Sequence, residues 1–211
     1  MSKKIVALFS AFLMLGSLSS QAAVITYSYA ELDGSFDASS NLLDYFNSQS
    51  ATEVSVTDFD MEGTFDDSIM NVTFTFDLAS DSAFEVFAGL DAGYGAEIYI
   101  NNALVLDSAA DLWWSKNWTS SDVISFEQLL TAGSNTFTIV WAEECCGGLS
   151  SIAFSSPLID GGDLTTLSLS ALNQLEAGAP GAPVAVNAPG TVGILALSLL
   201  TLVRVRKSTR A

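Results

Sequence analysis

The chain contains no histidine, only seven lysines and arginines, and two cysteines that are neighbours, Cys145 and Cys146. Without histidine, the common catalytic triads and the usual general base are excluded. No G-x-S-x-G, P-loop or dinucleotide-binding fingerprint is present either. We therefore expect a protein that is not an enzyme. A hydrolase that works with two carboxylates is the less favoured alternative.

Positive charge is almost absent from the middle of the chain. All 24 aspartates and glutamates lie between Glu31 and Glu176, where Lys116 is the single basic residue. Such a surface repels the phosphates of DNA and RNA, so we expect no nucleic-acid partner. Most of these acids are expected to form a soluble, hydrated surface.

The N-terminal segment, residues 1–23, has the pattern of a signal peptide. Lys3 and Lys4 precede an apolar run, and the small residues of Ser20-Gln21-Ala22-Ala23 suit cleavage by signal peptidase. The sequence therefore predicts export across the inner membrane. The mature domain is expected to span residues 24–176, followed by a Gly/Pro/Ala linker over residues 177–187.

The C-terminal segment, residues 188–211, lacks a hydrophobic run of the roughly 20 residues that a stable membrane span needs. It consists of the break Ala188-Pro189-Gly190, an apolar run over 191–203, and a basic tail over 204–210 with Arg204, Arg206 and Lys207. A short apolar run, followed by positive charges that stay on the cytoplasmic side, is typical of a sorting segment that enters the membrane only transiently. We therefore expect a short transmembrane sorting segment. An ordinary short membrane anchor is the alternative.

This C-terminal arrangement resembles the sorting signal of PEP-CTERM proteins, with Ala188-Pro189-Gly190 in place of the usual Pro-Glu-Pro. The resemblance implies delivery by the secretion machinery, followed by cleavage by an exosortase-type processing protease. It also implies a final location at the cell surface or in the extracellular matrix. Cys145, Cys146 and Gly148 match the Cys-Cys-x-Gly pattern of the CCXG group of these proteins.

Alternating apolar and polar residues predict an all-β protein, an antiparallel β-sandwich or jelly roll in a single domain. The expected strands cover Ile25–Tyr29, Val54–Phe59, Val72–Phe76, Phe84–Phe87, Glu97–Ile100, Leu104–Leu106, Phe137–Trp141 and Ile152–Phe154. Asn41–Phe46 is expected to form a short helix capped by Ser40. Leu164–Leu175 fits either a strand or a helix.

The order of turns in the middle of the chain resembles the lectin-type sandwich of anthrax protective antigen and the yeast flocculins. Asp91-Ala92-Gly93 stands where those domains have Asp-Asp-Gly, and Asn101-Asn102 stands at their next turn. The resemblance implies sugar binding assisted by calcium. Because Ala92 replaces the second aspartate, the calcium expectation rests on Asp91 alone.

The two cysteines are expected to pair with each other in an oxidising compartment. Since consecutive Cα atoms lie only about 3.8 Å apart, such a disulfide requires an unusual ring with a twisted or cis peptide. It would form a rigid apolar hump on which a sugar could rest. A rigid turn without a ligand, and bonds to another chain, remain alternatives.

Tryptophans supply the leading candidate site. Trp113, Trp114 and Trp118 lie close together in one loop, and indole faces beside polar groups suit a sugar ring. Neighbouring residues point opposite ways on a strand, so one of Trp113 and Trp114 is expected in the core. With Asn101 and Asn102, these residues predict non-catalytic binding of an extracellular polysaccharide. The alternative is a structural, acidic matrix or biofilm protein without a specific ligand.

Overall fold

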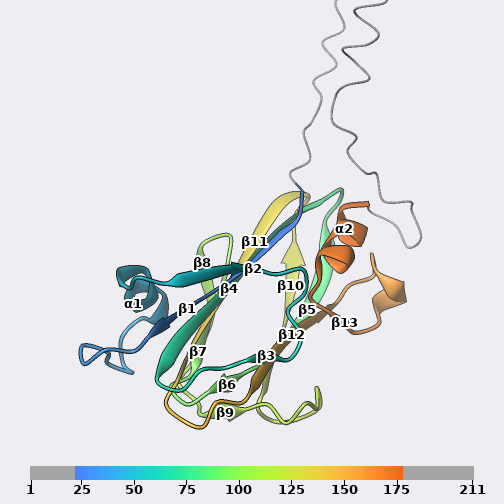
Figure 1. Cartoon of the computed structure of the whole chain (residues 1–211). Coiled ribbons are helices and arrows are strands. Elements are labelled where there is room, and N and C mark those ends of the chain that lie inside the picture. The colour runs from blue at the N-terminus through green and yellow to red at the C-terminus, as the bar shows by residue number, and fades with distance from the viewer. Residues whose placement is uncertain (1–21, 178–211) are drawn as a thin grey trace, which may run out of the picture.

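The computed structural model describes residues 22–177, which form two packed antiparallel sheets with two short helices (Figure 1). The predicted signal peptide, most of the linker and the sorting segment lie outside the described residues. Within residues 22–177, neither helix is long and apolar enough to cross a membrane.

The larger sheet has six antiparallel strands. Their order is β2 (Thr52–Ser55), β1 (Val24–Glu31), β4 (Ser68–Leu78), β11 (Gly133–Glu143), β7 (Ala96–Ile100) and β8 (Ala103–Ser108). The two longest strands, β4 and β11, pair along their whole length at its centre. This sheet is one layer of the predicted antiparallel sandwich.

The second antiparallel sheet packs across the core from the first, which confirms the predicted sandwich. It consists of β10 (Val123–Leu130), β5 (Ser82–Gly89), β12 (Leu149–Ser155) and β13 (Thr165–Thr166), with β3 (Glu62–Gly63) also paired to β12. A separate ribbon of β6 (Asp91–Ala92) and β9 (Leu112–Trp113) lies at one end of the sandwich. The described chain begins and ends at the other end, beside α2 (Figure 1).

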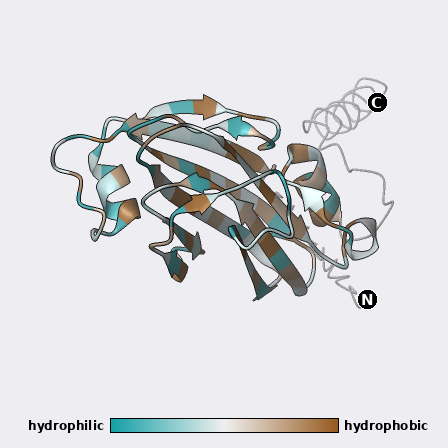
Figure 2. Ribbon diagram, turned by 90° about the horizontal axis from the view of Figure 1, so that it is seen from below, coloured by the Kyte–Doolittle hydropathy of each residue, from teal (hydrophilic) through white to brown (hydrophobic). Residues whose placement is uncertain are grey.

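The core forms because inward and outward residues alternate along the central strands, as the brown and teal stripes of Figure 2 show. On β4, the residues from Met70 to Leu78 at every second position are buried. Phe74 stacks on Phe137 of β11, with ring centroids 4.9 Å apart. On the outward face, the hydroxyl oxygens of Thr75 and Thr136 lie 3.0 Å apart across the same two strands.

Helix α1 (Leu42–Ser48) covers part of the outer face of the larger sheet. Its N-cap is Asn41, not the predicted Ser40, since the Asn41 side chain accepts a hydrogen bond from the backbone N–H of Asp44 at 2.7 Å. The buried Glu97 carboxylate of β7 then accepts from the N–H groups of Leu42 and Leu43, at 2.9 and 3.1 Å. An anchored carboxylate therefore satisfies the open N-terminal turn of the helix.

The ambiguous segment Leu164–Leu175 contains both kinds of element. Two residues form β13, and a short turn leads to α2 (Leu169–Ala177). Ala171, Leu172 and Leu175 are buried on α2 and belong to the same core as the sheets. This helix closes the end of the sandwich opposite β6 and β9 (Figure 1).

Removing the central ring of the core should destabilise the fold strongly. Phe137 is 1% exposed, and truncation to alanine deletes contacts that the packed strands cannot refill. We expect Phe137→Ala to lower the free energy of unfolding by about 3–5 kcal/mol in chemical denaturation. Leu129→Ala is the matched control, because Leu129 is 64% exposed and should change stability by about 0.5 kcal/mol or less. Equal effects of the two changes would contradict this core.

Candidate functional site

The loop between β11 and β12 carries the disulfide. Cys145 and Cys146 are bonded to each other, with their Cα atoms 3.7 Å apart, and the described residues contain no cis peptide. The predicted vicinal disulfide is confirmed, while the ring is accommodated without a cis bond. Cys146 has a φ of 72°, in the left-handed region that non-glycine residues seldom adopt. The loop is therefore held in a conformation that its surroundings must stabilise.

Glu143, the last residue of β11, stabilises the start of this loop. Its carboxylate accepts from the backbone N–H of Cys145 at 3.0 Å and from that of Gly93 at 2.6 Å. Glu143 is buried, so both oxygens exchange water for backbone donors. Glu143 thus links the disulfide loop to the turn after β6.

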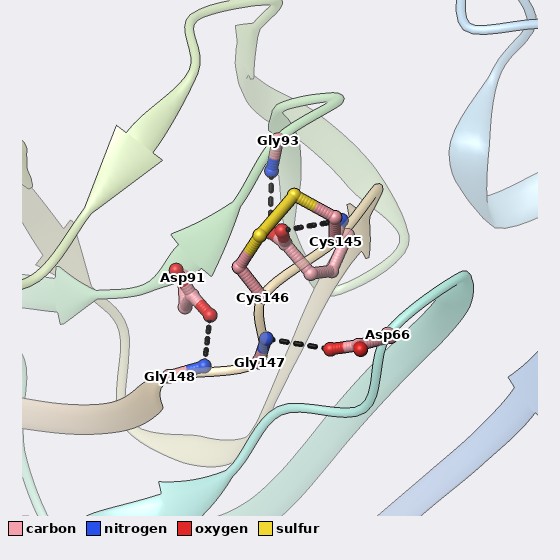
Figure 3. Close-up of a disulfide and its surroundings, with 8 residues drawn as sticks. Asp66, Asp91, Gly93, Cys145, Cys146, Gly147 and Gly148 are labelled. Atoms are coloured by element: carbon pink, nitrogen blue, oxygen red, sulfur yellow. Dashed lines mark hydrogen bonds between the residues drawn. A yellow bond between two sulfur atoms is a disulfide. The ribbon is translucent and has the colours of Figure 1, made fainter.

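Two aspartates hold the end of the loop from opposite sides (Figure 3). Asp66 accepts from the N–H of Gly147 at 2.6 Å, and Asp91 accepts from the N–H of Gly148. A side chain at either glycine would force its neighbours to move: a Cβ on Gly148 would lie 2.8 Å from an Asp91 oxygen. A Cβ on Gly147 would collide with the carbonyl oxygen of Thr64. These glycines provide space for their neighbours.

A pocket of about 250 Å³ opens beside the disulfide. Its lining consists of Asp91, Gly93, Asp111, Trp113, Glu143, Glu144, Cys145 and Cys146. Trp113 is opposite Asp91 in the β6–β9 ribbon and is 71% exposed. The pocket is thus lined by an exposed indole, a disulfide and several carboxylates.

The other two predicted tryptophans pack against each other and against β5. Trp114 is 3% exposed, and its ring lies so close to Gly89 that a Cβ there would approach to 2.6 Å. The half-buried Trp118 packs on Trp114, with ring centroids 4.8 Å apart. Of the neighbouring pair, Trp113 faces solvent, whereas Trp114 is buried; it packs on the outward side of β5 at Gly89 and not in the core between the sheets, where one of the two was expected.

Asn101 and Asn102 lie elsewhere, in the turn between β7 and β8 at the far end of β7 from the pocket. Both residues have positive φ, 51° and 66°, as a two-residue hairpin turn demands. The Asn101 side chain accepts from the N–H of Thr136 at 2.9 Å, which fixes the turn against β11. The structure does not bring these asparagines together with Trp113.

The residues around Asp91 do not form a recognisable cation site. Within residues 22–177, no group of three or more acidic, cysteine or histidine side chains is arranged to hold a metal ion. One Asp91 oxygen is already engaged by Gly148. The donor set around Asp91 therefore does not fit the calcium expectation.

Glu143 and Asp66 are important residues that the sequence did not reveal. In the sequence, Glu143 is distinguished only by its place near the cysteines, and Asp66-Asp67 has the pattern of an ordinary turn. Asp66 lies 81 positions before its partner Gly147. A contact over that separation leaves no local pattern in the sequence.

The buried carboxylates have shifted acidities. Burial raises the pKa of Asp91, an effect that the Gly148 hydrogen bond opposes and the nearby Asp111 reinforces. Burial likewise raises the pKa of Glu143, against the hydrogen bonds from Gly93 and Cys145. In both residues the neutral form is favoured more in the folded protein than in an ordinary, exposed carboxyl.

These shifts predict that the protein becomes more stable as pH falls. Between the ordinary carboxyl pKa and the raised folded value, the folded state binds more protons, so stability declines as pH rises. The pKa values of Glu62 and Glu176 are also raised, which acts in the same direction as at Asp91 and Glu143. The pKa values of Asp33 and Asp37, both exposed, are lowered, which acts against this pH dependence.

We therefore expect a higher melting temperature at about pH 5 than at about pH 8, at constant salt. Asp91→Asn should reduce this difference, because the amide oxygen can still accept from Gly148 but cannot ionise. A melting temperature that falls over this range on acidification would contradict the account.

No protein-family model and no curated protein sequence matches the chain. Among solved structures, it is similar to a PA14 sugar-binding domain from an RTX adhesin, with 14% identity, a TM-score of 0.48, and coverage of 71% of this chain and 96% of that one. It is similar to an anti-sigma factor domain-containing protein, with 13% identity, a TM-score of 0.49, and coverage of 79% and 49%. It is also similar to the Epithelial Adhesin 9 A domain of Candida glabrata, in complex with Galb1-4GlcNAc, with 10% identity, a TM-score of 0.46, and coverage of 69% and 90%. Likenesses at this level assign neither a family nor an activity to the chain.

Proposed function

We propose that the protein binds carbohydrate without catalysis, at the pocket between Trp113 and the disulfide. The observation that carries the proposal is the combination of a 71% exposed indole with a pocket of about 250 Å³ edged by carboxylates. The C–H face of a sugar ring packs on an aromatic face, while carboxylates accept hydrogen bonds from its hydroxyls. Asp111 and Glu144 are exposed at the pocket and are the acceptors we assign to this role.

The same carboxylates favour binding over hydrolysis. Glycoside hydrolysis needs one carboxyl to give a proton and another to act as a base or nucleophile. The buried pair at the pocket is Asp91 and Glu143. Both carboxylate oxygens of Glu143, and one of Asp91, accept from backbone N–H groups in and around the disulfide loop. These two side chains serve the structure of the site, so the proposal contains no catalytic step.

The proposal includes a location. We infer that the protein is exported and then processed by an exosortase-type protease, and that it remains at the cell surface or in the extracellular polysaccharide. The pattern of residues 1–23 and 188–211 supports this. In addition, the described chain begins and ends at the end of the sandwich opposite β9 (Figure 1). The pocket lies at the β9 end, so it faces away from a C-terminal attachment.

Loss of the indole should remove sugar binding and leave the fold intact. The purified full-length protein would be applied to an array of neutral, amino-bearing and acidic glycans, in calcium and again in chelator. We expect selective binding in both buffers, and at least tenfold weaker binding by Trp113→Ala. Leu129→Ala is the control, since it removes an exposed apolar side chain from β10, away from the pocket.

The outcomes separate the alternatives. Selective binding that is seen in calcium and lost in chelator would show that calcium assists binding, and would make Asp91 the candidate ligand. Binding that Trp113→Ala leaves unchanged would contradict the assigned pocket. Absence of binding to every glycan would favour the structural matrix protein without a specific ligand.

Processing predicts the absence of the C-terminal segment from the mature protein. Mass spectrometry of the protein from the outer fraction should find no peptide from residues 191–210, because cleavage precedes release. Replacing Arg204, Arg206 and Lys207 by glutamine should impair processing, since these charges hold the segment on the cytoplasmic side. An intact C-terminus in the outer fraction would indicate an ordinary anchor.

A further inference from the structure

A second, wider hollow of about 960 Å³ lies next to the first pocket, and the disulfide loop separates the two. Cys146 lines both hollows, and Gly147 lines the wider one, together with Tyr29, Phe65 and Asp66. The two hollows are therefore adjacent parts of one surface, with the loop as a ridge between them.

Hydrogen bonds fix the position of this ridge. On one side, the N–H of Thr64 donates to the carbonyl oxygen of Gly148 at 3.1 Å, and Asp66 accepts from Gly147 at 2.6 Å. On the other side, Asp91 accepts from Gly148 (Figure 3). Phe65, between Thr64 and Asp66, is thus held beside the ridge opposite Asp91 and its partner Trp113.

The wider hollow has an aromatic face of its own. Phe65 is 46% exposed, and its ring centroid lies 4.6 Å from that of Tyr29. Tyr29 in turn packs against the core from its position on β1. A large ring that is supported on one side and open on the other is a platform of the same kind as Trp113.

We propose that the site takes an extended segment of polysaccharide free of acidic groups, which crosses the disulfide ridge with one sugar on Trp113 and another on Phe65. This inference rests on the proposed function and adds the length and charge of the ligand. Glu31, Asp66 and Asp67 line the wider hollow, and Lys116 is the sole lysine or arginine between residues 22 and 177. Uronate or sulfate groups would therefore meet repulsion without a compensating cation.

The test compares oligosaccharides of increasing length on the full-length protein. The probes are neutral glucan, mannan and galactan oligomers of two and of six or more units, with uronate oligomers of equal length. We expect the long neutral oligomers to bind at least tenfold more tightly than the short ones. Phe65→Ala should abolish this gain while leaving the short oligomers unaffected, and Phe65→Trp should retain it. Leu129→Ala again serves as the control.

Each outcome has a distinct meaning. Short and long oligomers bound equally, or a gain with length that survives Phe65→Ala, would overturn the extended site and leave the proposed function standing. If uronate oligomers bound as tightly as neutral ones, the proposal that the ligand is free of acidic groups would be wrong. No binding of any glycan would overturn the proposed function itself.

Discussion

Hydrogen bonds from backbone N–H groups to buried carboxylates hold together the end of the sandwich that carries the pocket. The described chain has one lysine and no arginine, so its 24 carboxylates cannot be neutralised by ion pairs in general. Glu143 and Asp91 at this end are buried and accept from main-chain donors instead, as the buried Glu97 does at the start of α1. Such charge-assisted bonds are stronger than neutral ones, and loss of the acceptor would leave buried donors unsatisfied.

The geometry of the site depends on these bonds. A vicinal disulfide closes no long loop, so it gives little of the stability that an ordinary disulfide confers. Hydrogen bonds to carboxylates fix the position of the disulfide loop: Glu143 accepts at its start, and Asp66 and Asp91 accept at its end. Trp113 is fixed in turn by pairing with Asp91 in the β6–β9 ribbon. A ridge and an aromatic face that are already in place lose little freedom when a ligand binds.

The sequence predicted those parts of the fold that follow from local periodicity. Strands β4 and β11 alternate clearly because one face is buried along their length. Strand β10 was not predicted, since it pairs on one side only and much of its surface is exposed. In the site, the disulfide and the opposite orientation of Trp113 and Trp114 could be predicted from neighbouring residues. The contacts of Asp66 and Glu143 could not, because they span 81 and 50 positions.

The carboxylates around the pocket divide into two groups with different consequences. Asp91 and Glu143 are buried and accept from the loop, so a change there alters the fold and the pocket together. Asp111 and Glu144 are exposed, so a change there alters the surface that a sugar would meet. Loss of binding after a change at Asp91 would thus be ambiguous between a ligand and a scaffold role. A change at Trp113 is free of this ambiguity, because the exposed indole contributes little to the core and would affect a ligand chiefly through lost contact area.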